Sequence, residues 1–332
     1  MKIRNYLSGM LFVLCLTAIA VFLQGMSVSK HLGLSAIIIS ILIGMLVKNV
    51  IGVHNSMHLG INFCSKKVLR LAIILLGFKL SLLDISKIGY SALIVILIST
   101  TLTLILARVI GKKLGISRNL SILIGAGTSI CGASAIVAVN AVSKSENEEE
   151  TSFAVAVVTI LGTIFMFLYP FCFHLFTIST DAYALWTGAS IHEVAQVVAA
   201  GFAISPTIGS SATIVKLTRV LMVIPVTIIL SIRESRRKQS SEQPSLSAIT
   251  IPWFVLLFLL VVCINSLKIL PIEISSQLVI LDNYLMAAAM VALGLETSIL
   301  AIKQTGLKPL YLGIILSFFI SVVSLLIIEI FV

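Results

Sequence analysis

The feature that most constrains this chain is a series of long apolar runs that continues from one end to the other. Each run has about 20 mainly apolar residues, the length that a helix needs to cross the hydrocarbon core of a bilayer. Inside lipid, only helices and closed barrels satisfy the hydrogen-bonding groups of the backbone, and these runs are continuous and do not alternate. We therefore expect an all-α polytopic membrane protein whose surroundings are the lipid bilayer.

Composition excludes most soluble classes of protein. The 332 residues are 59% hydrophobic and 11% charged, whereas a soluble domain has roughly a quarter of its residues charged. The net charge of +10 does not indicate a nucleic-acid partner, because the Lys and Arg residues lie mainly in short loops. The five cysteines are scattered without a CxxC pair, so we expect no disulfide framework, no metal site and no cofactor.

Hydropathy divides the chain into about eleven transmembrane spans. The first follows Lys2 and Arg4 as a secretory signal would, but its long apolar core and the lack of a convincing cleavage site predict a retained helix. Most Lys and Arg residues fall on one side if the N-terminus is cytoplasmic, which places the C-terminus outside. The spans lie near 7–24, 32–50, 68–84, 88–108, 119–142, 151–174, 182–203, 212–232, 249–267, 278–300 and 308–331.

The spans group into an extra N-terminal helix, 1–31, and two five-span blocks, 32–174 and 175–332. An odd number of spans in each block gives the two blocks opposite orientations, which is the arrangement of an inverted-repeat transporter. The longest hydrophilic break, 233–247, is too short for a soluble domain. The function is therefore expected to lie within the membrane.

The fifth span is unusually rich in glycine and in small hydroxyl or thiol side chains. Glycine frees the backbone, and hydroxyl groups can cap backbone groups that lose their helical partners. This pattern predicts a helix broken near the midplane, whose second half points its N-terminus at a buried anion. The alternative is close helix packing through small residues. The candidate anion-binding residues are Gly127, Thr128, Ser129, Cys131, Gly132 and Ser134.

The tenth span contains Gly294 and occupies the same place in its block as the fifth span. Glycine-interrupted segments in corresponding positions of two halves indicate the binding site of a transporter. We therefore add Gly294 to the substrate-binding candidates. The alternative is that Gly294 is a packing contact.

The seventh span carries the adjacent ionisable residues His192 and Glu193. Such residues are costly within a bilayer and usually face a cavity or a partner. Both are candidates for proton coupling or gating, and Gln196 shares the helix face of His192 and is a candidate substrate ligand. The alternative is structural hydrogen bonding at the interface. Since Gln196 stands where a zinc protease motif needs a second histidine, a metalloprotease is not expected.

The eighth span places Lys216 and Arg219 on one helix face. An arginine can hold an oxyanion through two hydrogen bonds, so both residues are substrate-binding candidates. The alternative is that both side chains extend to the membrane surface near the outer end of the span.

Four strings resemble the bacterial YeiH-like family of proposed sulfate exporters, and the resemblance covers nearly the whole chain. They are GTSICGASAIVAVNAV (127–142), GASIHEVAQVVAAG (188–201), VKLTRVLMVIPV (215–226) and MVALGLETSI (290–299). The resemblance implies a bacterial inner-membrane protein related to the bile acid:sodium symporter superfamily. That superfamily has two inverted five-helix repeats with crossing broken helices, which places the crossing at the fifth and tenth spans.

Together these features favour a secondary active transporter of a small anion, such as sulfate or a related sulfur oxyanion. No Walker-type nucleotide motif is present in the sequence, so coupling to an H⁺ or Na⁺ gradient is expected. One alternative is a sodium-coupled carrier of organic anions, and a less favoured one is an intramembrane enzyme that uses Cys131 or His192. A sensor or scaffold would need a cytoplasmic domain that this chain lacks, and a homodimer is one assembly that the sequence allows.

Overall fold

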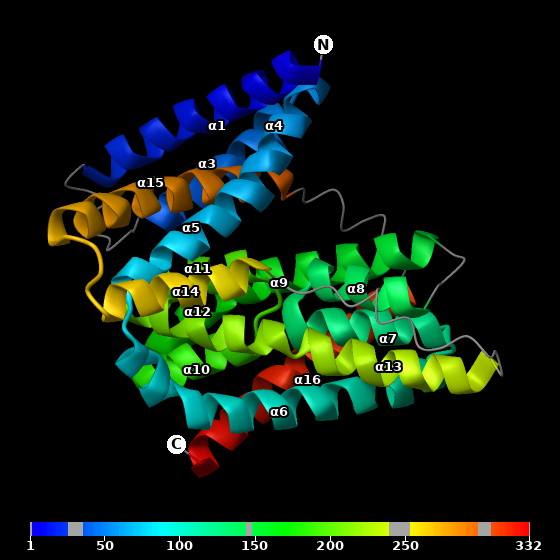
Figure 1. The fold of residues 1–332 in the computed structure, drawn as a ribbon. Coiled ribbons are helices and arrows are strands. Elements are labelled where there is room, and N and C mark those ends of the chain that lie inside the picture. The colour runs from blue at the N-terminus through cyan, green and yellow to red at the C-terminus, as the bar shows by residue number, and fades with distance from the viewer. Residues whose placement is uncertain (1, 26–35, 144–147, 239–252, 298–306, 332) are drawn as a thin grey trace. The chain divides into compact units, whose positions relative to one another are not determined.

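The computed structural model describes residues 2–25, 36–143, 148–238, 253–297 and 307–331. Every regular element in these ranges is a helix, and none is a strand (Figure 1). The all-α fold class is therefore confirmed. Most of the predicted loop 233–247 lies outside the described residues.

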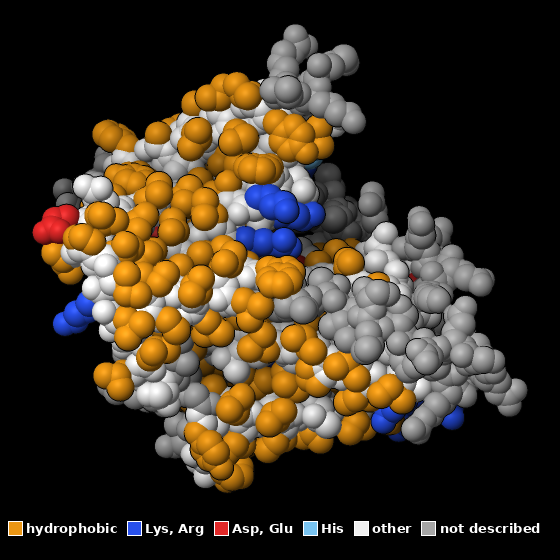
Figure 2. Space-filling view, in the orientation of Figure 1, with side chains coloured by type: hydrophobic (Ala, Val, Ile, Leu, Met, Phe, Trp, Pro, Cys, Tyr) orange, Lys and Arg blue, Asp and Glu red, His pale blue; other side chains and the backbone are white. Residues whose placement is uncertain are grey.

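Within the part of the chain that the structure describes, six helical segments are long and apolar enough to cross a membrane: Tyr6–Gly25, Ala92–Lys113, Glu150–Phe176, Pro206–Arg233, Ile272–Glu296 and Leu307–Phe331. Large apolar side chains also point outward, and Tyr90 and Ile272 are 79% and 78% exposed. Figure 2 shows hydrophobic side chains spread over the visible face. Such a surface is stable against lipid acyl chains and not against water. The chain is therefore a multi-pass membrane protein, while the number eleven stays a prediction.

The described residues form two compact units, each assembled from separate stretches of chain. The first unit holds Met1–Ser86, Phe202–Ser210 and Trp253–Leu300. Its main helices are α1 (Lys2–Gly25), α3 (Ala36–Leu46), α4 (His58–Phe63), α5 (Leu69–Leu76), α14 (Trp253–Ser266) and α15 (Ile272–Glu296). Short π-helical or 3₁₀ turns join some of them, namely η1 (Val47–Ile51), η2 (Asn55–Met57), η3 (Cys64–Val68) and η4 (Gly77–Lys79).

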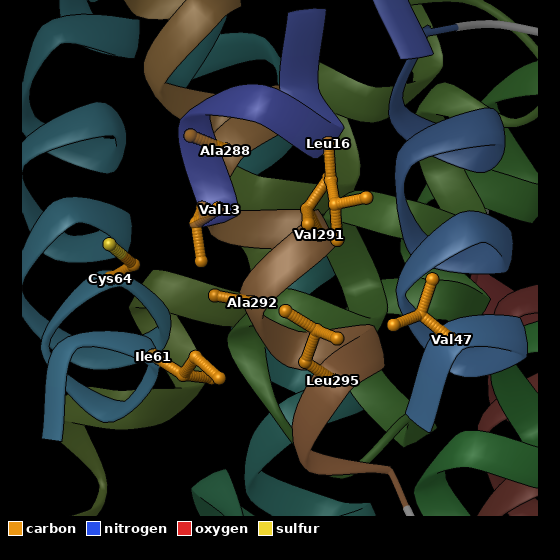
Figure 3. Packing of buried hydrophobic residues seen from close by; sticks show 9 residues of the cluster. All are labelled: Val13, Leu16, Val47, Ile61, Cys64, Ala288, Val291, Ala292 and Leu295. Carbon is orange, nitrogen blue, oxygen red and sulfur yellow. The ribbon is translucent and has the colours of Figure 1, made fainter. Parts of the chain in front are cut away.

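Helix α15 passes through the apolar core of this first unit. Its residues Val291, Ala292 and Leu295 lie among buried side chains from α1, η1 and α4 (Figure 3). The break predicted in the tenth span is wrong, because α15 continues as one helix from Ile272 to Glu296. A Cβ on Gly294 would overlap the carbonyl oxygen of Ile41 and lie 2.9 Å from the Cα of Gly44. Gly294 thus allows α3 and α15 to approach, which is the packing alternative.

The third span is longer than the predicted range 68–84. A helical path runs from Asn55 to Lys79 through η2, α4, η3, α5 and η4. The exposed residues Lys66 and Lys67 lie inside this path, in a π-helical turn. The predicted range 68–84 leaves both lysines outside the span, although a helix tolerates exposed lysines at its surface.

The second unit holds Lys87–Gly201, Ser211–Pro252 and Ala301–Val332. Within it, α16 packs against α7, α9 and α10, and α8 packs against α9 and α13. Three helices lie mostly in this unit, namely α6 (Leu82–Lys113), α11 (Val194–Phe202) and α12 (Pro206–Leu221). The others are α7 (Arg118–Ala126), η5 (Gly127–Cys131), α8 (Ala133–Ser143), α9 (Glu148–Phe176), α10 (Thr180–Ser190), α13 (Val223–Lys238) and α16 (Leu307–Phe331). The units group helices by compactness and differ from the blocks 1–31, 32–174 and 175–332, which were predicted from the order of the spans. The division into repeats stays a prediction.

Candidate functional site

Two helix breaks in the described part of the second unit lie close together, and the first of them is at Gly132. Helix α7 continues into the π-helical turn η5, and Gly132 then adopts φ +68° and ψ −136° before α8 begins. A side chain with a Cβ rarely adopts this backbone conformation, whereas glycine does so readily. The break predicted in the fifth span is therefore confirmed.

The second break lies in the seventh span, where none was predicted. Helix α10 ends at Ser190, Ile191 is extended with φ −65° and ψ 147°, and α11 begins at Val194. Positions 189–193 contain no glycine or proline, so the usual sequence signal for a break is missing. The signal that could have revealed it is the adjacent polar pair His192 and Glu193 within an apolar span.

Two buried cations from α12 join the ends of the helices that stop at these breaks. The Arg219 guanidinium donates from Nε to the Ser129 carbonyl at 2.6 Å and from Nη1 to the Ile191 carbonyl at 2.9 Å. Its Nη2 donates to the Thr128 carbonyl. Lys216 Nζ donates to the carbonyls of Ile130 and Ile191 at 2.8 and 2.7 Å. Carbonyl groups at the C-terminal end of a helix carry partial negative charge, so cations stabilise them there.

The burial of both cations corrects one reading of the sequence. Lys216 and Arg219 are both 0% exposed, and they lie near the middle of the candidate span Pro206–Arg233. They do not extend to the membrane surface near the end of a span. That span begins six residues earlier than predicted, at Pro206 and not at 212, which moves both cations inward.

On the other side of the breaks, Glu193 lies against the start of α8. A Cβ on Gly132 would overlap the Cγ of Glu193 and lie 3.1 Å from its Oε1. Thr159 of α9 donates its hydroxyl to the same Oε1 at 3.1 Å. The first residues of α8 and α11 are therefore neighbours, and their N-terminal N–H groups carry partial positive charge.

Gln196 caps the start of α11. Its Oε1 accepts the backbone N–H of Glu193 at 3.0 Å, and its Nε2 donates to the Thr159 carbonyl at 3.2 Å. Gly162 of α9 makes room for this amide, because a Cβ there would overlap Gln196 Oε1. Gln196 thus already has partners within the protein, so its geometry indicates a positioning role more than a direct ligand role.

Several buried polar atoms at the two breaks have no hydrogen-bond partner among the described residues. They are Thr128 Oγ1, Ser129 Oγ and His192 Nδ1, and all three side chains are 0% exposed. Buried polar atoms are nearly always paired, so unpaired ones indicate water or a ligand.

The hydroxyl of Ser134 lies 2.9 Å from Cys131 Sγ and donates to the Cys131 carbonyl at 3.1 Å.

His192 is held from behind by α16 and α9. Its Nε2 lies 2.9 Å from Ser317 Oγ, and its ring meets the Phe165 ring edge-on at 6.1 Å. Close by, the Tyr169 hydroxyl lies 2.7 Å from Ser190 Oγ, which joins α9 to the end of α10. These contacts fix the position of the second break.

The structure brings most of the predicted residues together. Those around the two breaks are Thr128, Ser129, Cys131, Gly132, Ser134, His192, Glu193, Gln196, Lys216 and Arg219. Gly127 is in the same turn but serves packing, since a Cβ there would lie 2.7 Å from Ile136 Cδ1. Gly294 belongs to the first unit, where it packs against Ile41 and Gly44 of α3. Sequence reasoning missed Thr159, Gly162 and Ser317, although two threonines that flank Gly162 within an apolar span are a detectable signal.

The geometry can also be compared with two other kinds of site, a Cys131–His192 nucleophilic pair and a metal site. No hydrogen bond joins Cys131 to His192, both of which are described, because the thiol lies against Ser134 and the imidazole against Ser317. A group of three or more His, Cys, Asp or Glu side chains able to hold a metal ion is not found in the described part of the chain.

A separate buried charge pair lies in the first unit. Lys79 Nζ is 2.6 Å from Asp282 Oδ2, and the Asp282 side chain is 0% exposed. Lys79 also donates to Asn283 Oδ1 at 2.8 Å and lies over the Phe202 ring. Asp282 and Asn283 therefore hold the Lys79 ammonium group.

Comparison with known proteins gives one consistent family. The profile of the family described as "Conserved hypothetical protein 698" matches residues 8–313. The chain is 39% identical over 317 residues to the UPF0324 inner membrane protein YeiH of Escherichia coli K12, and the match covers 94% of this chain and 90% of that protein. It is also 39% identical over 323 residues to a UPF0324 membrane protein of Haemophilus influenzae, covering 95% and 94% of the two chains. No solved structure shows significant similarity to this chain.

Proposed function

Because this chain belongs to the YeiH-like UPF0324 family of membrane proteins, we propose that it is a secondary active transporter of a small anion in the bacterial inner membrane. The anion is sulfate or a related sulfur oxyanion, and an ion gradient drives its movement. The observation that carries this proposal is the meeting of two half-helix N-termini at partly exposed residues. Ser134 is exposed and Glu193 is half-buried, while the opposite side of the breaks is closed by Lys216 and Arg219.

Anion binding at this place follows from helix electrostatics. The first N–H groups of α8 and α11 have no partner within their own helices, and the two helix dipoles add positive potential where they meet. The side chains of Thr128, Ser129, Cys131 and Ser134 are neutral hydrogen-bond donors at the first break. Lys216 and Arg219 add positive charge from behind, although their hydrogen bonds are directed at carbonyl groups.

The finer architecture is part of the same proposal. It comprises eleven spans, two inverted five-helix repeats, a cytoplasmic N-terminus and an outside C-terminus. In such transporters one part of the molecule rocks against the rest to open the midplane site to each side in turn. The kinship with bile acid:sodium symporters and a homodimeric assembly are proposals as well.

Sodium-coupled transport of an organic anion is the second candidate. It is favoured by the oxygen atoms of Glu193, Thr159 and Gln196, which lie around one break and are hard ligands of the type that small cations prefer. Coupling by sodium and coupling by protons make different predictions for flux in sodium-free buffer. An enzyme that uses Cys131 and His192 is not proposed, since the two side chains are not paired.

Flux measurements in proteoliposomes test the proposed function. The purified chain is reconstituted, and uptake of radiolabelled sulfate, sulfite and taurine is followed with an imposed pH gradient, with an imposed sodium gradient and with neither. We expect gradient-dependent flux of at least one sulfur oxyanion, and a clear loss in Ser129→Ala. Ser276→Ala, a serine replaced on the exposed surface of α15, is the matched control and should behave as the wild type. Well-folded protein that carries none of these anions under any gradient would contradict the proposal.

A further inference from the structure

The helix ends at the two breaks are compensated by charged groups of opposite sign. The ends of η5 and α10 present carbonyl groups, and Arg219 and Lys216 lie against four of these residues: Thr128, Ser129, Ile130 and Ile191. The starts of α8 and α11 present N–H groups, and the carboxylate of Glu193 lies there. Each set of partial charges thus faces a formal charge of the opposite sign.

Glu193 occupies the place that an incoming anion needs. Its side chain packs on Gly132 directly before α8, and its backbone is the first residue before α11. A carboxylate and a sulfur oxyanion prefer the same surroundings, namely free N–H groups and a positive dipole end. Two like charges cannot occupy such a small site together without strong repulsion.

We propose that the Glu193 carboxylate and the transported anion exclude each other at the N-termini of α8 and α11, so that the anion binds when Glu193 is protonated and is carried together with one proton. This inference rests on the proposed function and deepens it by naming the coupling ion and the residue that carries it. In the exchange, the ionised carboxylate takes up one proton and becomes neutral, and one anion then binds at the two helix starts. Release on the other side reverses both events.

The other titratable groups around the breaks are less suited to carry this proton. They are Lys216 and Arg219 of α12, His192 within the second break, Cys131 of η5 and Tyr169 of α9. Each of them is at most 5% exposed, whereas Glu193 is half-buried and therefore within reach of water. Around Glu193, α9 contributes the Thr159 hydroxyl, which donates to the carboxylate, and the Gln196 amide of α11 accepts the backbone N–H. The Lys216 ammonium of α12 also interacts electrostatically with the Glu193 carboxylate. His192 instead acts as a positioning residue through Ser317.

The isosteric substitution Glu193→Gln separates charge from shape. The amide is permanently neutral and has the same shape, so it still fits against Gly132. Its oxygen can still accept the hydrogen bond that the Thr159 hydroxyl donates. The dissociation constant for inorganic sulfate is measured for the wild type and the variant over about pH 3.5 to pH 8, which spans the range where a glutamate carboxyl loses its proton and extends well above it. If binding requires one proton, the wild-type dissociation constant rises about tenfold per pH unit once Glu193 is ionised.

We expect Glu193→Gln to bind sulfate with an affinity that does not change with pH and to lose the ability to accumulate sulfate in response to a pH gradient. Glu273→Gln, an exposed glutamate replaced on α15, is the matched control and should keep the wild-type pH dependence. A variant that is folded but keeps the wild-type pH dependence would overturn the inference, and so would a folded variant that no longer binds sulfate.

A second measurement needs no variant. When sulfate is added in weakly buffered solution at a pH where Glu193 is ionised, the wild-type protein should take up one proton from the solution per bound anion, as reported by a pH-indicator dye. Binding without proton uptake would overturn the inference and leave the proposed function intact. A wild-type protein that binds no sulfur oxyanion at any pH would instead contradict the proposed function itself.

Discussion

At the scale of single residues, the site depends on residues that allow or stabilise the interrupted backbone of the two helix breaks. Gly132 turns the chain where α8 begins, and Arg219 satisfies carbonyl groups from both breaks. The sequence identified both positions as functional candidates. It could not show that the cations bind backbone carbonyls, because those partners are separated from them by 86 to 91 residues for one break and 25 to 28 for the other.

Substitution of Gly132 by alanine should destabilise the protein. The backbone at φ +68° is strained for a residue with a Cβ, and the new methyl group would overlap Glu193. The expected loss is about 1 to 3 kcal/mol, measured as a lower unfolding midpoint in detergent. Gly25→Ala is the matched control, since a Cβ there meets nothing within 4 Å. An unchanged midpoint for Gly132→Ala would show that the break tolerates a side chain.

Substitution of Arg219 by lysine should also destabilise the protein, although the charge is kept. A lysine cannot reproduce the planar fork that reaches the carbonyls of Ser129 and Ile191 at once. Each buried charged hydrogen bond that is lost costs about 1.5 to 3 kcal/mol. Arg233→Lys on the exposed part of α13 should have little effect on the unfolding midpoint. Equal midpoints for the two variants would mean that Arg219 acts only as a charge.

At the scale of elements, hydropathy located the helices but not their interruptions. The break at Gly132 could be predicted because glycines and hydroxyl groups cluster there. The break at 191–193 was missed, because its stabilising groups are the distant residues Lys216, Arg219 and Ser317 and its local signal is limited to one polar pair. Gly294 shows the opposite error, since one glycine in an apolar span permits either a break or a close contact, and only the neighbouring Gly44 decides between them.

Replacement of Gly294 by alanine tests this reassignment. The added methyl group would force α3 and α15 apart, so we expect a loss of about 1 to 3 kcal/mol in stability. Sulfate affinity of the folded fraction should be unchanged, because Gly294 lies in the first unit and the candidate site in the second. A large loss of affinity with unchanged stability would return Gly294 to the binding site.

The pair Lys79 and Asp282 gives a prediction for the first unit. Lys79→Met leaves a carboxylate that is 0% exposed without its partner, which should cost about 3 to 5 kcal/mol. The double variant Lys79→Met/Asp282→Leu removes both charges and should be more stable than Lys79→Met alone. Unfolding midpoints of the two variants and the wild type provide the comparison. A double variant less stable than the single one would show that Asp282 has further essential partners.

At the scale of the whole molecule, composition and family agree on a multi-pass membrane protein, and the relatives found here are named only as membrane proteins. The sequence predicted the all-α class and identified most residues around the candidate site. The division into two units could not be predicted, because each unit combines stretches from distant parts of the chain. The central claim is that a small anion binds where α8 and α11 begin.

The most direct test of this claim is to locate a bound anion in an experimental structure. Selenate has the shape and charge of sulfate, and selenium can be identified by anomalous scattering in crystals of the sulfur-containing protein. The account predicts a selenium peak within hydrogen-bonding distance of the first residues of α8 and α11, beside Ser134 and Glu193, at a pH where Glu193 is protonated. A selenium peak bound elsewhere in the membrane-spanning part, or no peak at a selenate concentration that saturates transport, would contradict it.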